Sequence, residues 1–119
     1  MPHLDRTGFG WLEIDGQRYD HDVLIRLNGK IKRRKKKLSK RIYGTSHTIS
    51  LDEARHIFED GATVLIIGSG QYDNVRLSPE AEEYFRKQRC EVRLSPTPEA
   101  IAAWNHAPAA AVGLFHVTC

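Results

Sequence analysis

Two polar, glycine-containing turns carry the side chains with the clearest chemical potential. One turn is residues 68–72, directly after the apolar run 64–67, and the other is residues 45–47. Glycine adopts positive φ without strain, so its backbone can approach a ligand closely. In open α/β sheets, ligands collect beyond the carboxyl ends of parallel strands. We therefore predict one shallow ligand-binding site between the two turns, with a small anion or metabolite as its ligand. Its candidate residues are Thr45, Ser46, His47, Gly68, Ser69, Gly70, Gln71 and Tyr72. The alternative is that these side chains only satisfy the backbone of buried turns.

The glycine turn does not complete a nucleotide-binding motif. Gly68 and Gly70 occupy the first two glycine positions of G-x-G-x-x-G, but Asp73 replaces the third. The following helix is expected only near Pro79, so its N-terminus is not presented to a pyrophosphate in the usual way. The Gly-Lys-Ser/Thr ending of a P-loop is absent. We predict a tight turn of the sheet and no cofactor.

Nucleophilic and metal chemistry have weak support. Ser69 lacks the flanking glycines of G-x-S-x-G. Cys119 could use His116 or His47 as a base, although a cysteine on a strand is more often a small apolar filler. The histidines lie far apart in the sequence, and no paired Cys/His spacing suggests zinc. We predict no catalytic residue and no metal.

Six consecutive cations form the most strongly charged segment, namely Lys32, Arg33, Arg34, Lys35, Lys36 and Lys37. Residues 1–43 carry a net charge of +7 and residues 44–119 a net charge of −4. This asymmetry favours an acidic partner or weak self-association. Nucleic acid is one acidic partner, but no aromatic residues are interleaved with the run. We favour a solvated edge hairpin, whose lysines block sheet aggregation, over a nucleic-acid site.

Apolar patterning predicts the strands that position these residues. Residues 64–67 are a continuous apolar run rich in β-branched residues, typical of a strand covered on both faces. Strands are also predicted at residues 9–14, 19–27, 30–37, 92–94 and 110–117. Asp15-Gly16 is a strong signal for a hairpin turn between the first two of these.

Capping residues predict three helices. Ser50 with Glu53 forms a capping box, and Ser78-Pro79 and Thr97-Pro98 are cap-proline starts. The strand–helix alternation after residue 50 implies right-handed crossovers and a parallel sheet, whereas the earlier hairpins pair antiparallel. We therefore predict an α/β fold with a mixed sheet.

The size and composition of the chain limit its class. A chain of 119 residues forms one α/β domain, residues 1–119. The two cysteines make no disulfide framework, which favours reduced cytosol. There is neither a long apolar run nor signal-peptide architecture. We expect a soluble, cytoplasmic protein without a membrane span.

Several short motifs resemble a known family. They are Tyr19-Asp20-His21-Asp22, Tyr43-Gly44-Thr45-Ser46-His47, Ile67-Gly68-Ser69-Gly70-Gln71-Tyr72, Leu77-Ser78-Pro79, Pro96-Thr97-Pro98-Glu99-Ala100 and Gly113-Leu114-Phe115-His116-Val117-Thr118-Cys119. Over nearly its whole length the chain resembles the small domain family that includes the adipogenesis-associated domain-containing protein and a mitochondrial complex I assembly factor. The resemblance implies a three-layer fold, with a central mixed five-stranded sheet, flanking helices and an added N-terminal β-hairpin. It supplies no catalytic residues. The chain departs from the family pattern in its uniformly basic residues 32–37 and in Asp73-Asn74, where a glycine is expected.

The resemblance favours an accessory or assembly-type binding protein that has a protein partner and no catalytic activity. The alternative is a protein or enzyme that binds a small molecule or anion at the glycine turn. A third class is weak nucleic-acid binding through the basic hairpin. An ordered ligand at residues 68–72 would favour the second class, whereas an apolar surface patch would favour the first.

Overall fold

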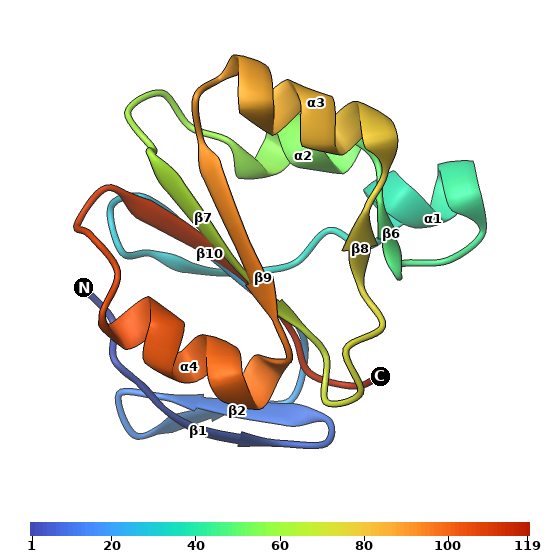
Figure 1. Ribbon diagram of the computed structural model, residues 1–119. Helices are drawn as coiled ribbons and strands as arrows, with labels where there is room; N and C mark the ends of the chain where they lie inside the picture. The colour runs from blue at the N-terminus through green and yellow to red at the C-terminus, as the bar shows by residue number, and fades with distance from the viewer.

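The computed structural model describes residues 1–119 and is built around one five-stranded sheet (Figure 1). Its strand order is β5-β4-β10-β7-β9. The strands are β4 (Val23–Ile25), β5 (Ile31–Arg33), β7 (Val64–Ser69), β9 (Glu91–Ser95) and β10 (Ala111–His116). β10, β7 and β9 pair in parallel, whereas β4 and β5 join antiparallel. The predicted mixed sheet is confirmed.

Helices cover both faces of this sheet. The helices α2 (Leu51–Ile57) and α3 (Pro79–Lys87) lie over one face, and α4 (Thr97–Asn105) lies over the other (Figure 1). A short parallel pair, β6 (Thr48–Ile49) with β8 (Arg76–Leu77), precedes α2 and α3. The central layer is therefore enclosed, as the apolar run of β7 predicted. None of these helices has the length and apolarity needed to cross a membrane.

The N-terminal part forms a separate three-stranded antiparallel sheet beside α4. Its strands are β1 (Leu4–Gly8), β2 (Trp11–Ile14) and β3 (Gln17–Tyr19). Asn105 at the end of α4 fixes the first strand, because its side chain accepts from Leu4 N at 3.0 Å and donates to Leu4 O at 2.8 Å. The predicted N-terminal hairpin is thus part of a three-stranded sheet, because β1 adds a strand that was not predicted.

Two predicted strands were too long. Residues 19–27 do not form one strand: β3 ends at Tyr19 and β4 begins at Val23 in the other sheet. The prediction of one strand over the basic segment 30–37 was also wrong. β5 spans only Ile31–Arg33, and an unpredicted helix, α1 (Lys37–Tyr43), follows it. In each case the chain turns so that a charged side chain, Asp22 or Arg34, enters the interior.

The sheet divides the apolar interior into two clusters. Ile67 and Leu114 belong to the cluster beneath α2 and α3, whereas Ile66 and Phe115 belong to the cluster beneath α4. All four side chains are at most 1% exposed. The strands predicted at residues 64–67 and 110–117 are therefore buried, as their apolar sequences indicate. Their side chains do not share one core but pack on opposite faces of the sheet, because successive side chains of a strand alternate.

The predicted helix starts hold in two of three cases. Ser50 Oγ accepts from Glu53 N and Ser78 Oγ accepts from Ala81 N, each at 3.1 Å. The third start was wrong in detail. Thr97 is the first helical residue rather than the cap, and its hydroxyl donates to His116 O at 2.6 Å. That bond ties the start of α4 to the end of β10.

Candidate functional site

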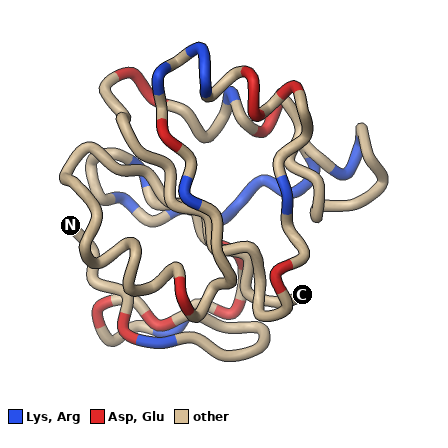
Figure 2. The backbone as a smooth tube through the Cα atoms, in the orientation of Figure 1, with Lys and Arg blue, Asp and Glu red and all other residues tan.

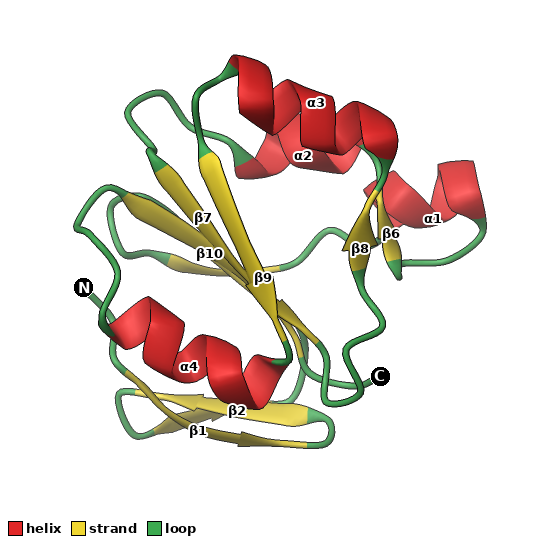
Figure 3. Cartoon of the chain, in the orientation of Figure 1, coloured by secondary structure: helices red, strands yellow, loops and turns green.

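The predicted glycine turn lies at the carboxyl end of β7 and contacts the end of the described chain. In Figure 3 the loop from β7 to β8 passes beside the segment that follows β10. Gln71 N donates to Thr118 O at 2.7 Å, and Tyr72 N donates to Cys119 O at 3.2 Å. Gly70 has φ of +102°, and a Cβ there would come within 2.8 Å of His116 Cδ2. Gly70 therefore has the positive φ that glycine adopts without strain.

The second predicted turn approaches the same histidine from the other side. The imidazole rings of His47 and His116 meet edge to face, with centroids 5.3 Å apart. Thr45 Oγ1 accepts from His47 N at 3.1 Å, which is a local turn contact. His47 and Gly70 are thus brought together, with His116 between them.

The other side chains of the predicted site point elsewhere. Gln71 Nε2 donates to Thr7 Oγ1 at 3.1 Å, and the Tyr72 ring packs 5.8 Å from the Phe9 ring. Ser69 Oγ donates to the Asp73 carboxylate, within the loop itself. None of the four surface hollows is lined by residues 45–47 or 68–72. The two turns therefore do not enclose a ligand cavity in this structure.

A buried ionic network lies behind these turns, centred on Arg34. Its guanidinium binds the Glu53 carboxylate through Nε at 2.7 Å and Nη2 at 3.0 Å, and Nη1 binds Asp22 Oδ2 at 3.0 Å. Nη2 also donates to Ser46 O at 2.7 Å. The side chains of Arg34, Asp22 and Glu53 are at most 1% exposed. Both carboxylates and the guanidinium are therefore paired, as buried charges require.

Asp22 extends the network to the last strand. Its Oδ2 lies 2.7 Å from His116 Nδ1, and its Oδ1 accepts from Val117 N at 2.9 Å. Burial opposes ionisation of Asp22, but the contacts with His116 and Arg34 outweigh it and lower its pKa from 3.8 to about 2. The carboxylate therefore stays ionised at neutral pH.

Asp22, His116 and Thr118 form a chain of polar contacts that resembles a catalytic arrangement. His116 Nε2 lies 3.1 Å from Thr118 Oγ1, so the imidazole connects a carboxylate to a hydroxyl, as in catalytic triads. However, His116 is only 2% exposed, and both of its ring nitrogens are engaged. His47 covers it, and burial followed by the charges of His116 and Arg34 lowers the pKa of His47. In this closed arrangement the network braces β4, β10 and α2 against one another.

The predicted basic surface needs one correction. Figure 2 shows the cations as a nearly continuous segment between β5 and α1. Lys32, Arg33, Lys35 and Lys37 are exposed and Lys36 is half-buried, but Arg34 is 5% exposed and belongs to the interior. The two carboxylates of Asp22 and Glu53 explain this difference, because they compensate the charge of one buried guanidinium.

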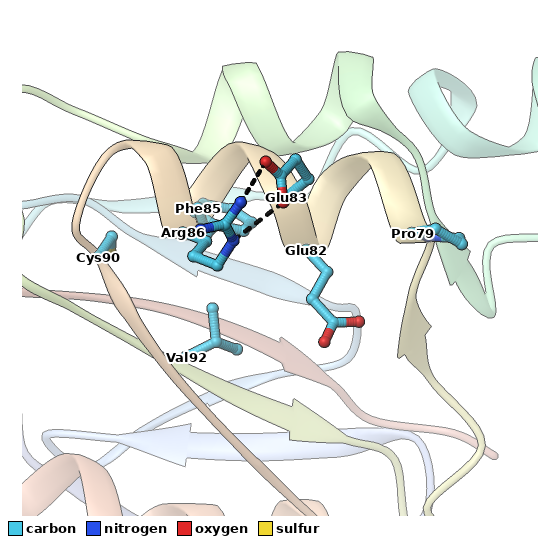
Figure 4. Close-up of a pocket in the computed structure, with 7 residues that line it drawn as sticks. All are labelled: Pro79, Glu82, Glu83, Phe85, Arg86, Cys90 and Val92. Atoms are coloured by element: carbon cyan, nitrogen blue, oxygen red, sulfur yellow. Dashed lines mark hydrogen bonds and ion pairs between the residues drawn. The ribbon is translucent and has the colours of Figure 1, made fainter.

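The largest hollow lies between helix α3 and strand β9 (Figure 4). Its volume is about 540 Å³, and its lining residues are Pro79, Glu82, Glu83, Phe85, Arg86, Cys90 and Val92. A second hollow of about 310 Å³ shares Glu82 and Val92 and continues to Leu77 and Leu94. In Figure 4 the Val92 side chain points toward α3, and Glu82 extends toward β9. Together the two hollows form one groove, called here the α3/β9 groove.

The strand beside this groove has an open edge. β9 is the last strand in the sheet and pairs only with β7. Glu91 N donates to Thr63 O at 2.9 Å, toward β7. Because backbone groups of successive strand residues point to opposite sides, the N–H and C=O of Val92 and Leu94 face the open edge. The groove is thus bordered by unpaired strand backbone.

The thiol in the groove is not a reactive nucleophile. Cys90 is 4% exposed, and burial raises its pKa to about 11. A thiol with such a pKa is almost entirely protonated at neutral pH. No group of three His, Cys, Asp or Glu side chains is arranged to hold a metal ion.

Sequence reasoning missed most of the ionic network. The signal for His116 was present, since a histidine within the apolar strand 110–117 requires a polar partner when buried. Glu53 was assigned to a capping box, but its side chain binds Arg34 and Ser39 instead of returning to Ser50 N. Arg34 carried no signal, because its neighbours in the sequence are also cations.

Comparisons with known proteins agree with this architecture. The chain matches the family model described as "Protein of unknown function (DUF498/DUF598)" over residues 4–111. It is similar to the structure of the conserved hypothetical protein PH1505 from Pyrococcus horikoshii OT3, with 33% identity, a TM-score of 0.90 and 98% of each chain covered. It is also similar to MT938, with 28% identity, a TM-score of 0.83 and 100% of each chain covered. Its likeness to a Mth938-like domain from Bordetella pertussis shows the fold alone, with 15% identity, a TM-score of 0.70, and 98% of this chain and 85% of that one covered.

Proposed function

This chain belongs to the DUF498/DUF598 family of Mth938-like domains. We propose that it is a non-catalytic accessory protein that binds a segment of a partner protein in its α3/β9 groove. The family includes a mitochondrial complex I assembly factor, which supports an accessory role. The observation that carries the proposal is the groove bordered by the open edge of β9.

The geometry favours an extended segment as the occupant. An added strand can bond to the outward N–H and C=O groups of Val92 and Leu94, as in other complexes formed by strand addition. Alternate side chains of such a segment would enter the groove, where the half-buried Leu77, Val92 and Leu94 supply apolar surface. Backbone pairing then gives affinity, and the groove gives specificity.

Charge restricts the sequence of that segment. Glu82 lines both hollows and forms no ion pair, whereas Glu83 pairs with Arg86 and Glu91 pairs with Arg93. A free carboxylate in the middle of the groove favours Lys or Arg in the partner. The expected segment alternates apolar residues and carries one cation opposite Glu82. We further propose a reducing compartment, because Cys90 and Cys119 are both free thiols.

The test begins with affinity purification from the native host and identification of the captured protein by mass spectrometry. The purified partner is then titrated calorimetrically against the wild type and Glu82→Arg. We expect Glu82→Arg to weaken binding at least about tenfold, which corresponds to about 1.4 kcal/mol. Amide hydrogen exchange at Val92 and Leu94 should slow in the complex, since an added strand bonds those groups.

Glu99→Arg is the matched control. Glu82 and Glu99 are both exposed acids in the first turn of a helix, so the two reversals cost similar helix-dipole energy. Only Glu82 lines the groove. Equal binding by wild type and Glu82→Arg, with unchanged exchange at Val92, would overturn the proposal. Concentration-dependent dimerisation through the same amides would instead identify a second copy as the occupant.

A further inference from the structure

We propose that the hollow between strand β5 and helix α2 binds the phosphate groups of a small molecule, with a diphosphate or triphosphate as the preferred size. This site is separate from the α3/β9 groove, because the two share no lining residue. Its volume is about 330 Å³, and its lining residues are Leu24, Arg26, Lys32, Arg33, Lys35 and His56. Four of these six side chains are permanent cations at neutral pH.

The fold explains why the cations converge. Lys32 on the edge strand β5 pairs directly with Leu24 on β4, and Leu24 packs beneath α2. Neighbouring residues on paired strands share a face, so Lys32 lies on the face that α2 covers. The α2 helix contributes His56 from its last turn. Arg26 is held in place by a bond from its Nη1 to His56 O at 2.8 Å.

Most of this positive charge lacks an intramolecular partner. Arg26 pairs with Glu59 at 3.3 Å, but Lys32, Arg33 and Lys35 have no carboxylate within 4.0 Å. Arg34 lies between them in the sequence, but its charge is paired with Glu53 and Asp22 in the interior. Arg33 pairs with Val23, which packs beneath α4, so its side chain lies on the other face of the sheet. Lys32 and Lys35 are therefore the uncompensated cations of the hollow, and with Arg26 they match the two to four negative charges of a diphosphate or triphosphate.

The ionisation of His56 is consistent with this positive potential. Burial is the main cause that lowers its pKa, and the charges of Lys35 and Arg26 lower it further. A neutral imidazole leaves the hollow able to donate or accept one hydrogen bond beside the cations. A ligand with both phosphate oxygens and a polar substituent therefore fits its lining.

The lining favours a small phosphorylated molecule over a nucleic acid. No Phe, Tyr or Trp lines the hollow, so there is no surface on which bases can stack. The one apolar lining residue, Leu24, is only 1% exposed. A volume of about 330 Å³ lies within the usual range for small-molecule pockets.

The experiment titrates the purified chain with inorganic pyrophosphate, tripolyphosphate and ATP at physiological salt, with calorimetry and amide NMR as readouts. We expect saturable binding of pyrophosphate or tripolyphosphate and amide shifts at Leu24, Lys32 and His56. Tighter binding of ATP than of tripolyphosphate identifies a nucleotide as the ligand class. Equal binding identifies the phosphate chain alone.

Two matched double variants test the location. Lys32→Gln with Lys35→Gln removes two charges from the hollow and should weaken pyrophosphate binding at least tenfold. Lys37→Gln with Lys40→Gln removes the same charge from exposed positions of α1 and should change binding less than twofold. All four side chains are exposed, so both variants should remain folded. Equal losses in both variants, absence of binding at physiological salt, or tighter binding of an oligonucleotide than of tripolyphosphate would each overturn the proposal.

Discussion

Replacing Asp22 with asparagine removes the carboxylate that connects Arg34 to the end of β10. Asp22 accepts hydrogen bonds from Arg34 Nη1 and Val117 N, and its Oδ2 lies 2.7 Å from His116 Nδ1. An asparagine presents an NH₂ group in place of one oxygen. That group would face either the Val117 N–H or the Arg34 guanidinium, and neither can accept its hydrogen. At least one buried donor therefore loses its partner.

The magnitude follows from the pKa and from the lost partner. The pKa of Asp22 is lowered from 3.8 to about 2. Since one pKa unit corresponds to about 1.4 kcal/mol, the ionised carboxylate contributes about 2.5 kcal/mol to stability at neutral pH. An unsatisfied buried donor costs a further amount of about 1 kcal/mol or more. We expect Asp22→Asn to lower the free energy of unfolding by about 3–5 kcal/mol, the usual range for breaking a buried ion pair.

The loss should also depend on pH. The folded-state pKa lies below the unfolded value, so the contribution is fully present above pH 3.8 and is lost as pH falls through 2. The difference between wild type and Asp22→Asn should therefore narrow as pH decreases from 5 to 2. The measurement is urea unfolding at several pH values, with tryptophan fluorescence as the signal.

Asp20→Asn is the control, because Asp20 is 73% exposed and pairs only with Arg18 at the surface. It should change stability by no more than about 0.5 kcal/mol. A loss below about 1 kcal/mol for Asp22→Asn, or a difference that does not vary between pH 5 and 2, would refute the assigned role of this carboxylate.

Three further predictions concern the core, the glycine turn and the thiol. Ile66→Ala should lower the free energy of unfolding by about 2–5 kcal/mol, since Ile66 is fully buried; a change below about 0.5 kcal/mol in denaturant unfolding would contradict its place in the core. Gly70→Ala should cost about 2 kcal/mol or more, because φ is +102° and the new Cβ would lie 2.8 Å from His116 Cδ2. Gly16→Ala, with φ of +80° and no atom within 4 Å of its Cβ, should cost less in the same thermal unfolding assay. Cys90 should resist iodoacetamide at pH 7.5, because its pKa is raised to about 11; rapid alkylation of the folded protein, detected by peptide mass spectrometry, would contradict its burial.

The sequence predicted the parallel half of the fold better than the antiparallel half. The strand at residues 64–67 and the helix starts at Ser50 and Ser78 depend on local patterns, and the structure has all three. The division of residues 19–27 between two sheets depends on Asp22, which turns inward to meet His116. His116 is 94 residues further along the chain, so no local pattern contains that information.

The candidate site was predicted less well for the same reason. Gly70 and His47 do converge, because both border the carboxyl ends of β7 and β10. Gln71 and Tyr72 follow different contacts, since Thr7 and Phe9 of the N-terminal sheet lie within their reach. The hydropathy pattern of a sequence does not predict which way a polar side chain on a loop will point. The burial of Arg34 was equally hidden, because its partner carboxylates lie 12 and 19 residues away.

The position of β10 has a consequence for how the chain is made. β10 lies at the centre of the sheet, between β4 and β7, although it follows both of them in the sequence. During synthesis, the pair β4–β5 and the pair formed by β7 and β9 therefore emerge before the strand that joins them. Until residues 111–116 have left the ribosome, both pairs present unpaired edges, and such edges are prone to aggregation. The central sheet thus closes late, and this interval is when a chaperone that shields strand edges would be most useful.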